Sequence, residues 1–334
     1  MERNLYSSNE IKVIKKNIEL FKNFYLKSNK KPFYYLTTSI IAYISSIYVT
    51  KKNKYFIPLF SFCTIRLFII FHDCCHNSFF KVTEKQHNSG FRGYNKIIGQ
   101  ILEPFVTYDE LNWRKTHSSH HKAHGNKNEI DPSKMIITLS EYNNLSFFRK
   151  IKYRIIHSPI LFFTIFAPLY SFWLLHIHKP AHMIKRIIFY SIIFKFGKID
   201  LVKKIFIGQS LAGTIGIMLF HLQHTVNIGY WESFDKRDQL SYDRAQLHGA
   251  SMLYVPKFLK WITFGIEYHH IHHLTPRIPS YNLQKCHENN KHLFNKITKV
   301  GYKQAFKSLF HTLYDEKGKK YISFGIYRFF GLQA

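Results

Sequence analysis

The sequence predicts an all-α integral membrane bundle of about four transmembrane helices, with a cytosolic helical cap that holds a site for two metal ions. Three observations support this fold class: long uncharged apolar runs, a large basic excess, and histidines that gather beside those runs. The 334-residue chain is 46% hydrophobic and 17% aromatic, and its formal net charge is +28 at pH 7. An apolar chain with basic flanks is typical of a membrane protein rather than of two soluble domains.

Four apolar runs are the candidate membrane spans. Residues 33–50, 155–178 and 205–231 contain no Asp, Glu, Lys or Arg, and residues 55–71 contain only Arg66. A helix needs about 20 predominantly apolar residues to cross roughly 30 Å of hydrocarbon, so each run is a plausible span. We expect Arg66 to snorkel to the interface rather than face the bundle interior.

The chain is predicted to form one membrane domain with two basic cytosolic ends. Residues 1–32 are the N-terminal segment, 33–290 the membrane domain and 291–334 the C-terminal tail. The Lys-rich start lacks the short apolar core of a signal peptide, so we expect a cytosolic N-terminus. A reducing compartment fits the cysteines better than paired disulfides do. They are Cys63, Cys74, Cys75 and Cys286.

Histidine is the most informative residue type. The chain has 21 histidines, and four groups of them adjoin predicted membrane segments. On a helix, residues i, i+3 and i+4 share one face with Cβ atoms about 5–6 Å apart, so each group can aim its imidazoles in one direction. The groups are His72 and His76 in "HDCCH", His117, His120 and His121 in "HSSHH", His221 and His224 in "HLQHT", and His269, His272 and His273 in "HHIHH".

This concentration of imidazoles predicts a metal centre. Neutral imidazole is the commonest transition-metal ligand, and crowded imidazoles without a metal lose hydrogen bonds. Eight or nine nitrogens exceed the needs of one ion, so we expect two ions with four or five nitrogens each. Histidine-only sites with open positions suit redox iron better than structural zinc. The remaining histidines are expected not to bind metal: His221 and His270, and as solvated or capping residues His87, His124, His157, His176, His178, His182, His248, His287, His292 and His311.

A shared site requires that all the groups lie at one membrane face. If the first two runs form a hairpin through the "KKNK" turn, the chain returns to its starting side at His72. If 155–178 crosses outward and 205–222 returns, His224 and the third box reach that same side. The connection 179–204 would then lie on the outer face, although its seven basic residues oppose the positive-inside rule.

The motifs occur in the order "HDCCH", "WRKTHSSHH", "LQHT" and "EYHHIHHLTPRIPSYNL". This order resembles the HxxxH, HxxHH and HxxHH boxes of the membrane-bound fatty-acid desaturases, over roughly residues 33–290. The third box and its "TPRIPSY" tail are most similar to acyl-lipid desaturases of the delta-12 and omega type and their bacterial relatives. The resemblance implies a set of iron ligands: His72, His76, His117, His120, His121, His224, His269, His272 and His273.

The resemblance also implies the reaction and the partners. Two histidine-bound irons at the cytosolic face would use O2 and two electrons to place a cis double bond in an acyl chain carried by a phospholipid or a thioester. The membrane would be the endoplasmic reticulum or the plasma membrane, with both termini cytosolic. His269 stands where front-end desaturases with a fused electron carrier have Gln, and the chain lacks "HPGG". A separate donor such as cytochrome b5 or ferredoxin is therefore expected.

One position departs from the family pattern. In some relatives an Asn four residues before the isolated histidine helps to hold a metal-bound water. Phe220 occupies that position here, which leaves the coordination of that metal open. His221 or Asn227 could substitute.

Further residues near the boxes are candidates for supporting roles. Carboxylates could accept the second imidazole N–H and fix the ligand tautomers, or form surface salt bridges. Trp113, Arg114 and Arg277 could contact a lipid head group or the electron donor, although interfacial anchoring is the simpler interpretation. The carboxylate candidates are Asp73, Asp109, Glu110, Asp131 and Glu267.

An aliphatic C–H bond has no acidic proton and no electrophilic carbon, so the predicted chemistry needs an oxygen-activating metal rather than acid–base catalysis. The apolar spans are expected to supply a tunnel for the acyl chain. Two alternatives remain: a lipid hydroxylase or carotenoid ketolase with the same site, and a histidine-lined metal transporter. A chain with four apolar spans argues against nucleic-acid binding, and the basic excess would instead attract anionic head groups or an acidic donor.

Overall fold

The computed structural model describes residues 4–25, 28–83, 89, 92–134, 136–169, 179–227 and 229–324. This part of the chain is mostly helical, as predicted, and it carries a few short strands that were not predicted. The helices are α1 Ser8–Tyr25, α2 Lys30–Lys52, α3 Ile57–Cys75, α5 Gly93–Val106, α6 Glu110–Ala123, α7 Leu139–Asn143, α8 Phe147–Ile156, α9 Pro159–Leu161, α10 Pro180–His224, α11 Gln239–His248, α12 Lys260–Thr263, α13 His269–Leu274, α14 Ser280–Asn289 and α15 Tyr302–Ser308. Short non-α turns are η1 Lys54–Phe56, η2 Phe162–Phe166, η4 Lys257–Leu259 and η5 Lys291–Leu293, and the strands are β1 Ile137–Thr138, β2 Ser251–Leu253, β3 Thr298–Val300, β4 Leu313–Asp315 and β5 Lys320–Ile322.

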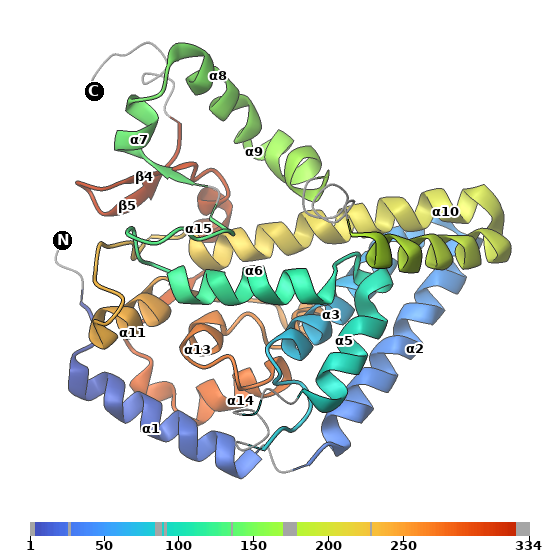
Figure 1. The fold of residues 1–334 in the computed structure, drawn as a ribbon, viewed down its shortest axis with the longest axis horizontal. Helices are drawn as coiled ribbons and strands as arrows, with labels where there is room; N and C mark the ends of the chain where they lie inside the picture. Colours follow the sequence, from blue (N-terminus) through green and yellow to red (C-terminus); the bar gives the residue numbers. More distant parts are fainter. Residues whose placement is uncertain are drawn as a thin grey trace.

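The first predicted hairpin is present as α2, η1 and α3. The side chain of Asn53 accepts a hydrogen bond from the backbone N–H of Tyr55 at 2.9 Å, which caps η1, and Pro58 lies in the first turn of α3. The two helices run antiparallel, and Tyr43 of α2 packs on Phe60 of α3 with ring centroids 5.1 Å apart. The chain therefore returns to its starting end at the first histidine box (Figure 1).

Arg66 faces the interior of the bundle, so the expectation that it snorkels is wrong. Its side chain is buried, and its Nε donates to Ser39 Oγ of α2 at 2.7 Å. The guanidinium also donates to the carbonyl of Trp261 and lies 4.2 Å from the ring centroid of Phe264. Hydrogen bonds and aromatic faces offset the cost of taking this charge out of water. A contact from a distant segment decided the position of this side chain.

α10 folds back on itself, which corrects the expectation for residues 179–204. The backbone is not helical at Gly197 (φ −148°, ψ 17°) or at Lys198 (φ 56°, ψ −163°), and the helix reverses there (Figure 1). Tyr190 Oη on the first arm donates to Gln209 Oε1 on the second arm at 2.5 Å. The segment is therefore an antiparallel helical hairpin and not a polar connection.

The apolar run 187–196 forms part of the first arm of this hairpin. Basic residues gather at its tip, where Lys204 Nζ donates to the carbonyl of Lys51 at 3.3 Å. The Lys51 ammonium lies 4.2 Å from the ring centroid of Phe196, so the tip of α10 lies beside the α2–α3 turn. Lysines at helix ends can reach water while their stems cover apolar surface, which accounts for the basic excess of this segment.

Two other predicted spans differ from the structure. In its described part, the run 155–178 is not one straight helix, because α8 ends before Pro159 and α9 starts there. Proline has no backbone N–H and biases the preceding residue away from helical geometry, so it breaks the run. Residues 170–178 lie outside the described residues. The run 205–231 leaves the helix after His224.

Among the described residues, two helices are long and apolar enough to cross a membrane, Lys54–Cys75 and Pro180–His224. A bundle of about four spans stays a prediction. Large apolar side chains are exposed along one side of α2 and along α10, as on helices that face lipid rather than water. They include Ile41, Ile44, Tyr48, Ile184, Ile187, Ile188, Ile192, Phe206 and Ile207.

The cap is built by α6, α11, α13 and α14, with α1 along its edge (Figure 1). α1 is tied to it by an ion pair of 2.7 Å between Lys15 and Asp243. The strands β2 and β3 pair in parallel, and β1, β4 and β5 form a second small sheet in which β1 and β4 are parallel. α1 thus packs against the region that contains the histidine boxes.

Candidate metal centre

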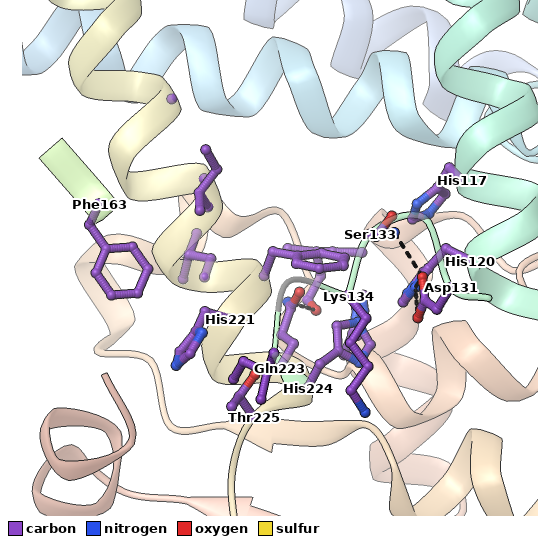
Figure 2. A pocket seen from close by; sticks show the side chains of 18 of the residues that line it. His117, His120, Asp131, Ser133, Lys134, Phe163, His221, Gln223, His224 and Thr225 are labelled. Carbon is purple, nitrogen blue, oxygen red and sulfur yellow. Dashed lines mark hydrogen bonds and ion pairs between the residues drawn. The ribbon is translucent and has the colours of Figure 1, made fainter. Parts of the chain in front are cut away.

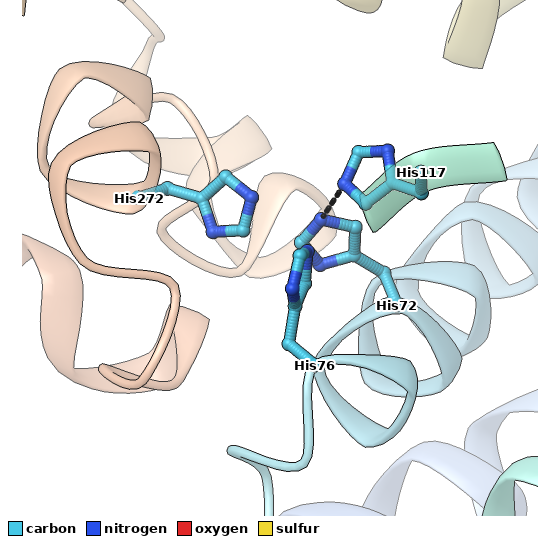
Figure 3. Close-up of side chains that lie close together, drawn as sticks. All are labelled: His72, His76, His117 and His272. Atoms are coloured by element: carbon cyan, nitrogen blue, oxygen red, sulfur yellow. Dashed lines mark hydrogen bonds between the residues drawn. The ribbon is translucent and has the colours of Figure 1, made fainter. Parts of the chain in front are cut away.

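One group of histidines forms where α3, α6 and α13 meet (Figure 3). Ligand atoms of His72, His76, His117 and His272 all lie within 4.8 Å of one another. His121 joins them, because its Nε2 is 3.2 Å from His117 Nε2 and 3.1 Å from His272 Nε2. We call these five residues the first group.

A second group lies beside the first. Ligand atoms of His120, His124 and His273 lie within 4.8 Å of one another, and so do those of His224, His269 and His273. The Nε2 atoms of His224 and His269 are 3.0 Å apart. We call these five residues the second group. All four sequence motifs thus converge on one place.

The histidines of the second and third boxes divide between the two groups. On α6, His117 and His121 face the first group, whereas His120 and His124 face the second. Each pair is separated by four residues and so shares one helix face. α13 likewise sends His272 to the first group and His269 and His273 to the second. α6 and α13 therefore each contribute histidines to both groups.

The nitrogen atoms of these ten histidines fit the binding of metal ions. Six Nε2 atoms lie 3.0–3.2 Å from another imidazole Nε2, in the pairs His72–His117, His117–His121, His121–His272 and His224–His269. In the described part of the chain, the other four Nε2 atoms are buried without a hydrogen-bond partner, on His76, His120, His124 and His273. Buried unpaired nitrogens are costly, and two bound ions would satisfy them.

Burial keeps these imidazoles neutral. Desolvation, and after it the neighbouring imidazoles, lowers the pKa of His117, His121 and His273 well below the usual value for histidine. Neutral imidazole is the form that binds a metal ion. The electrostatics of the cap therefore favour the ligand form of these side chains.

Two of the predicted carboxylates contact a ligand histidine. His72 Nδ1 donates to Asp73 Oδ1 at 3.0 Å, and Asp73 also accepts from the backbone N–H and the hydroxyl of Ser280 at 2.6 and 2.8 Å. His120 Nδ1 donates to Asp131 Oδ2 at 2.9 Å. A carboxylate on Nδ1 fixes the tautomer in which Nε2 is free for a metal. The contact with Ser280 gives a structural reason for the "TPRIPSY" tail after the third box.

Gln246 of α11 has a comparable role that the sequence analysis missed. Its Oε1 lies 3.0 Å from His273 Nδ1, and its Nε2 donates to the carbonyl of His121 at 3.2 Å. One amide therefore orients a ring of the second group and holds the backbone of the first. No motif or spacing connects α11 with the boxes, so only the fold reveals this contact.

Other predicted supporting residues are used elsewhere. Asp109 caps α6 by accepting from the N–H of Asn112 at 2.7 Å, and Glu110 pairs with Arg92 at 2.6 Å. Glu267 is buried, and this burial raises the pKa of its carboxyl. Among the described residues, the Glu267 carboxylate makes no hydrogen bond to a box histidine.

The two candidates for the position that Phe220 leaves open also have other partners. His221 Nε2 donates to the carbonyl of Ser308 at 2.8 Å. Asn227 is paired with the backbone of Tyr321, accepting at 2.8 Å and donating at 2.9 Å. The structure thus does not bring either side chain to the second group.

The residues expected at the interface have three different environments. Trp113 stacks on His117 with ring centroids 4.2 Å apart, so it packs against the first group, and its anchoring at the interface stays a prediction. Arg114 lies 3.5 Å from Glu110 on the same helix. Arg277 is half-buried in the turn between α13 and α14. Aromatic packing against the first group explains why a tryptophan precedes the second box.

Two histidines outside the predicted ligand set have different positions relative to the two groups. His270 points away from the centre and contacts His287, Nε2 to Nδ1, at 3.3 Å, as expected for the interposed residue of box three. His124 was expected to be a solvated or capping residue; it does stand at the C-cap of α6, but its side chain is buried within the second group. Its position four residues after His120 was the signal that could have identified it.

A cavity of about 390 Å³ borders both groups (Figure 2). Its wall runs from Ile65 and Phe68 of α3 and Gly216 of α10, past the histidines, to Lys134 and Tyr321 of the cap. Its volume is in the usual range for a small-molecule site, and most of the wall is apolar. Lys134, which no sequence pattern marked, lies 3.0 Å above the ring centroid of Trp231.

Comparison with known proteins agrees with these features. The profile of the family described as "Fatty acid desaturase" matches residues 55–304. A fatty acid desaturase of Bacillus subtilis (strain 168) is 34% identical over 276 residues, which are 78% of this chain and 74% of the relative. An sn-1 oleoyl-lipid 12-desaturase of Synechocystis is 26% identical over 67% of this chain and 64% of its own length. A chloroplastic omega-6 fatty acid desaturase of Brassica napus is 25% identical over 78% of this chain and 60% of its own length.

Proposed function

The chain belongs to the fatty acid desaturase family and is a desaturase enzyme, and we propose that it introduces a cis double bond into the acyl chain of a membrane lipid. The proposal assigns it two iron ions, held by the first and second groups, with O2 as co-substrate. One observation carries it: ten histidines, all but His76 and His224 fully buried, meet in two groups at the wall of a largely apolar cavity.

The two groups would each hold one iron. His72, His76, His117, His121 and His272 would bind the first ion, and His120, His224, His269 and His273 the second. When bound, the iron pair would supply the oxidising power that an unactivated C–H bond requires, because no side chain can abstract such a hydrogen by acid–base chemistry. Asp73 and Asp131 would keep the imidazoles of His72 and His120 in the ligand tautomer.

The cavity wall would position the substrate. Ile65, Phe68 and Val106 line its apolar part and would hold the acyl methylenes and exclude water. Its other end is lined by Lys134 and Tyr321, near the cap surface, where a polar acyl carrier would lie. The distance of a methylene along the cavity would then set the position of the double bond.

The carrier and the donor are part of this proposal. Two relatives are named as lipid 12-desaturases and three as omega-6 fatty acid desaturases, which supports a lipid-bound acyl substrate for this chain. The electrons would come from a separate protein such as cytochrome b5 or ferredoxin. The histidine groups and both termini would face the cytosol, with the apolar sides of α2 and α10 in lipid. A metal transporter would instead need ligands along a path through mid-membrane.

The test is the fatty-acid profile of a host with and without the gene, with double-bond positions located by mass spectrometry. A new unsaturated product, two mass units lighter than its precursor, would support a desaturase, whereas a gain of about sixteen mass units would indicate a hydroxylase. The product should depend on O2 and disappear in a His272→Ala variant. His292→Ala is a matched control, because His292 is exposed and outside both groups.

A further inference from the structure

We propose that His124 is the fifth nitrogen ligand of the second metal position, which makes the two groups equal, with five imidazoles each. The inference rests on the proposed function, because it presumes that both groups bind iron. It adds a ligand that lies outside the three histidine boxes and the isolated histidine.

The geometry places the His124 ring among the second group. Its centroid lies 4.3 Å from that of His273, 4.6 Å from His224 and 5.3 Å from His120. The side chain is 5% exposed, and its Nε2 is buried without a hydrogen-bond partner among the described residues. A buried imidazole nitrogen beside three other imidazoles has a ligand's environment.

The surroundings leave no competing ligand at this position. The phenyl ring of Phe220 packs on His120 and His224, with centroids 5.1 and 4.7 Å away, so the side chain at position 220 offers no ligand atom. His221 and Asn227 are engaged by Ser308 and Tyr321, as described above. Among the described residues, the ligand-atom groups at this position contain histidines alone, and His124 is the one of them outside the predicted ligand set.

The local backbone holds His124 in place. The residue ends α6 with a non-helical ψ of 128°, and Gly125 follows with φ +72°, where a Cβ would lie 2.6 Å from Ala245 Cβ. The next residues are fixed by a hydrogen bond of 2.7 Å from the N–H of Lys127 to the carbonyl of Glu232. The loop is thus pinned directly after the proposed ligand.

A second glycine makes room for the ring. A Cβ at Gly249, which follows α11, would lie 2.5 Å from His124 Nε2. Two glycines from different segments therefore accommodate this histidine, one through its backbone conformation and one through its lack of a side chain. Space and restraint of this kind are what a preorganised ligand needs.

The experiment uses the full chain, purified in detergent and loaded with ferrous iron enriched in the Mössbauer isotope. Iron per chain, iron affinity and the Mössbauer spectrum are measured for the wild type, His124→Ala, His124→Asn and the control His292→Ala. We expect both His124 variants to lose at least about tenfold in affinity at one of the two sites, and to shift one of two ferrous signals. Imidazole in the buffer should restore the His124→Ala spectrum towards that of the wild type.

Different results overturn the inference and the proposed function. If the wild type holds two irons and both variants give its spectrum and affinity, His124 is not a ligand. Reduced stability of the metal-free variants with an unchanged spectrum would assign a packing role and also overturn the inference. A wild type that binds no more than one iron, or yields no oxygen-dependent product, would instead refute the proposed function itself.

Discussion

The two histidine groups differ in their relation to the cavity. In the first group, only His72 and His117 line the cavity, and the group is locked into the cap by the contact of Asp73 with Ser280. The second group presents most of its members to the cavity, and its carboxylate partner Asp131 lies in the cavity wall. These members are His120, His124, His224 and His269. Two similar histidine groups thus have different surroundings, one tied to the fold of the cap and one turned towards the cavity.

The largest effect is expected from removing one ligand of either group. His272→Ala in the first group and His120→Ala in the second should each abolish the unsaturated product and reduce bound iron from about two to about one per chain. Product analysis and metal determination on the purified variants check this, with His292→Ala as control. Activity in both variants would contradict the ligand assignment.

Substitution of Asp73 and of Asp131 should distinguish the loss of imidazole orientation from the loss of fold stability. Asp73→Ala and Asp131→Ala are each expected to lower iron affinity by about 10–100-fold, since each frees an imidazole to rotate. Only Asp73→Ala should also lower the free energy of unfolding, by about 1–3 kcal/mol, because it leaves the buried N–H of Ser280 unpaired. Iron titration and chemical unfolding of the metal-free proteins measure the two effects.

Asp235→Ala is the control for this pair, because its side chain is 65% exposed. If Asp73→Ala and Asp131→Ala have the same free energy of unfolding, the first group is no more firmly built into the fold than the second.

Two glycines of α10 allow a comparison between the cavity, which Gly216 lines, and a packed helix interface, where Gly208 lies beside Phe60. A side chain at Gly216, which lines the cavity, would meet no atom within 4 Å, whereas a Cβ at Gly208 would overlap the ring of Phe60. Gly216→Leu should keep iron content and stability but reduce conversion of long acyl chains, relative to shorter ones, about tenfold. Gly208→Ala should instead lower the free energy of unfolding by about 1–3 kcal/mol.

Chain-length profiles and unfolding curves of the two variants provide the measurement. An unchanged chain-length preference in Gly216→Leu would mean that the acyl chain does not occupy this part of the cavity.

The smallest effect is expected at Trp113, whose histidine contacts among the described residues are with His72 and His117 of the first group. Trp113→Phe keeps an aromatic ring but loses part of the contact with His117, so the free energy of unfolding should fall by about 0.5–1.5 kcal/mol. The ferrous signal of the first group should shift and that of the second should not. Tyr55→Phe, at a position 79% exposed, is the control. A shift confined to the second group would reverse our assignment of the two sites.

Some features could be predicted because they depend on residues close together in the chain. The α2–α3 hairpin follows from two apolar runs and a short polar turn, and the shared face of His117 and His121 follows from helical periodicity. The convergence of the motifs was also expected, because a metal site shared by these imidazoles requires all the motifs to lie at one membrane face. Family membership rests on these same local patterns.

Other features could not be predicted because they depend on contacts between distant segments. The run 155–178 was predicted as one span because its hydropathy is high on both sides of Pro159, where the helix breaks. The reversal at Gly197 was not predicted because it lies in a basic stretch that was predicted to be a polar connection. Arg66 was expected to reach water, yet the interior acceptors Ser39 and Trp261 hold it. Each error came from scoring one segment without its neighbours.

The sequence by itself determined the helical character, the first hairpin and the residue types of a histidine metal centre, because periodicity and composition act over a few turns of one helix. Only the tertiary structure decided how the imidazoles divide into two groups. It also decided that Asp73, Asp131 and Gln246 orient three of them, and that His124 is among them. Those outcomes depend on distances between α3, α6, α11 and α13, which are set by packing and not by the order of residues in any one helix.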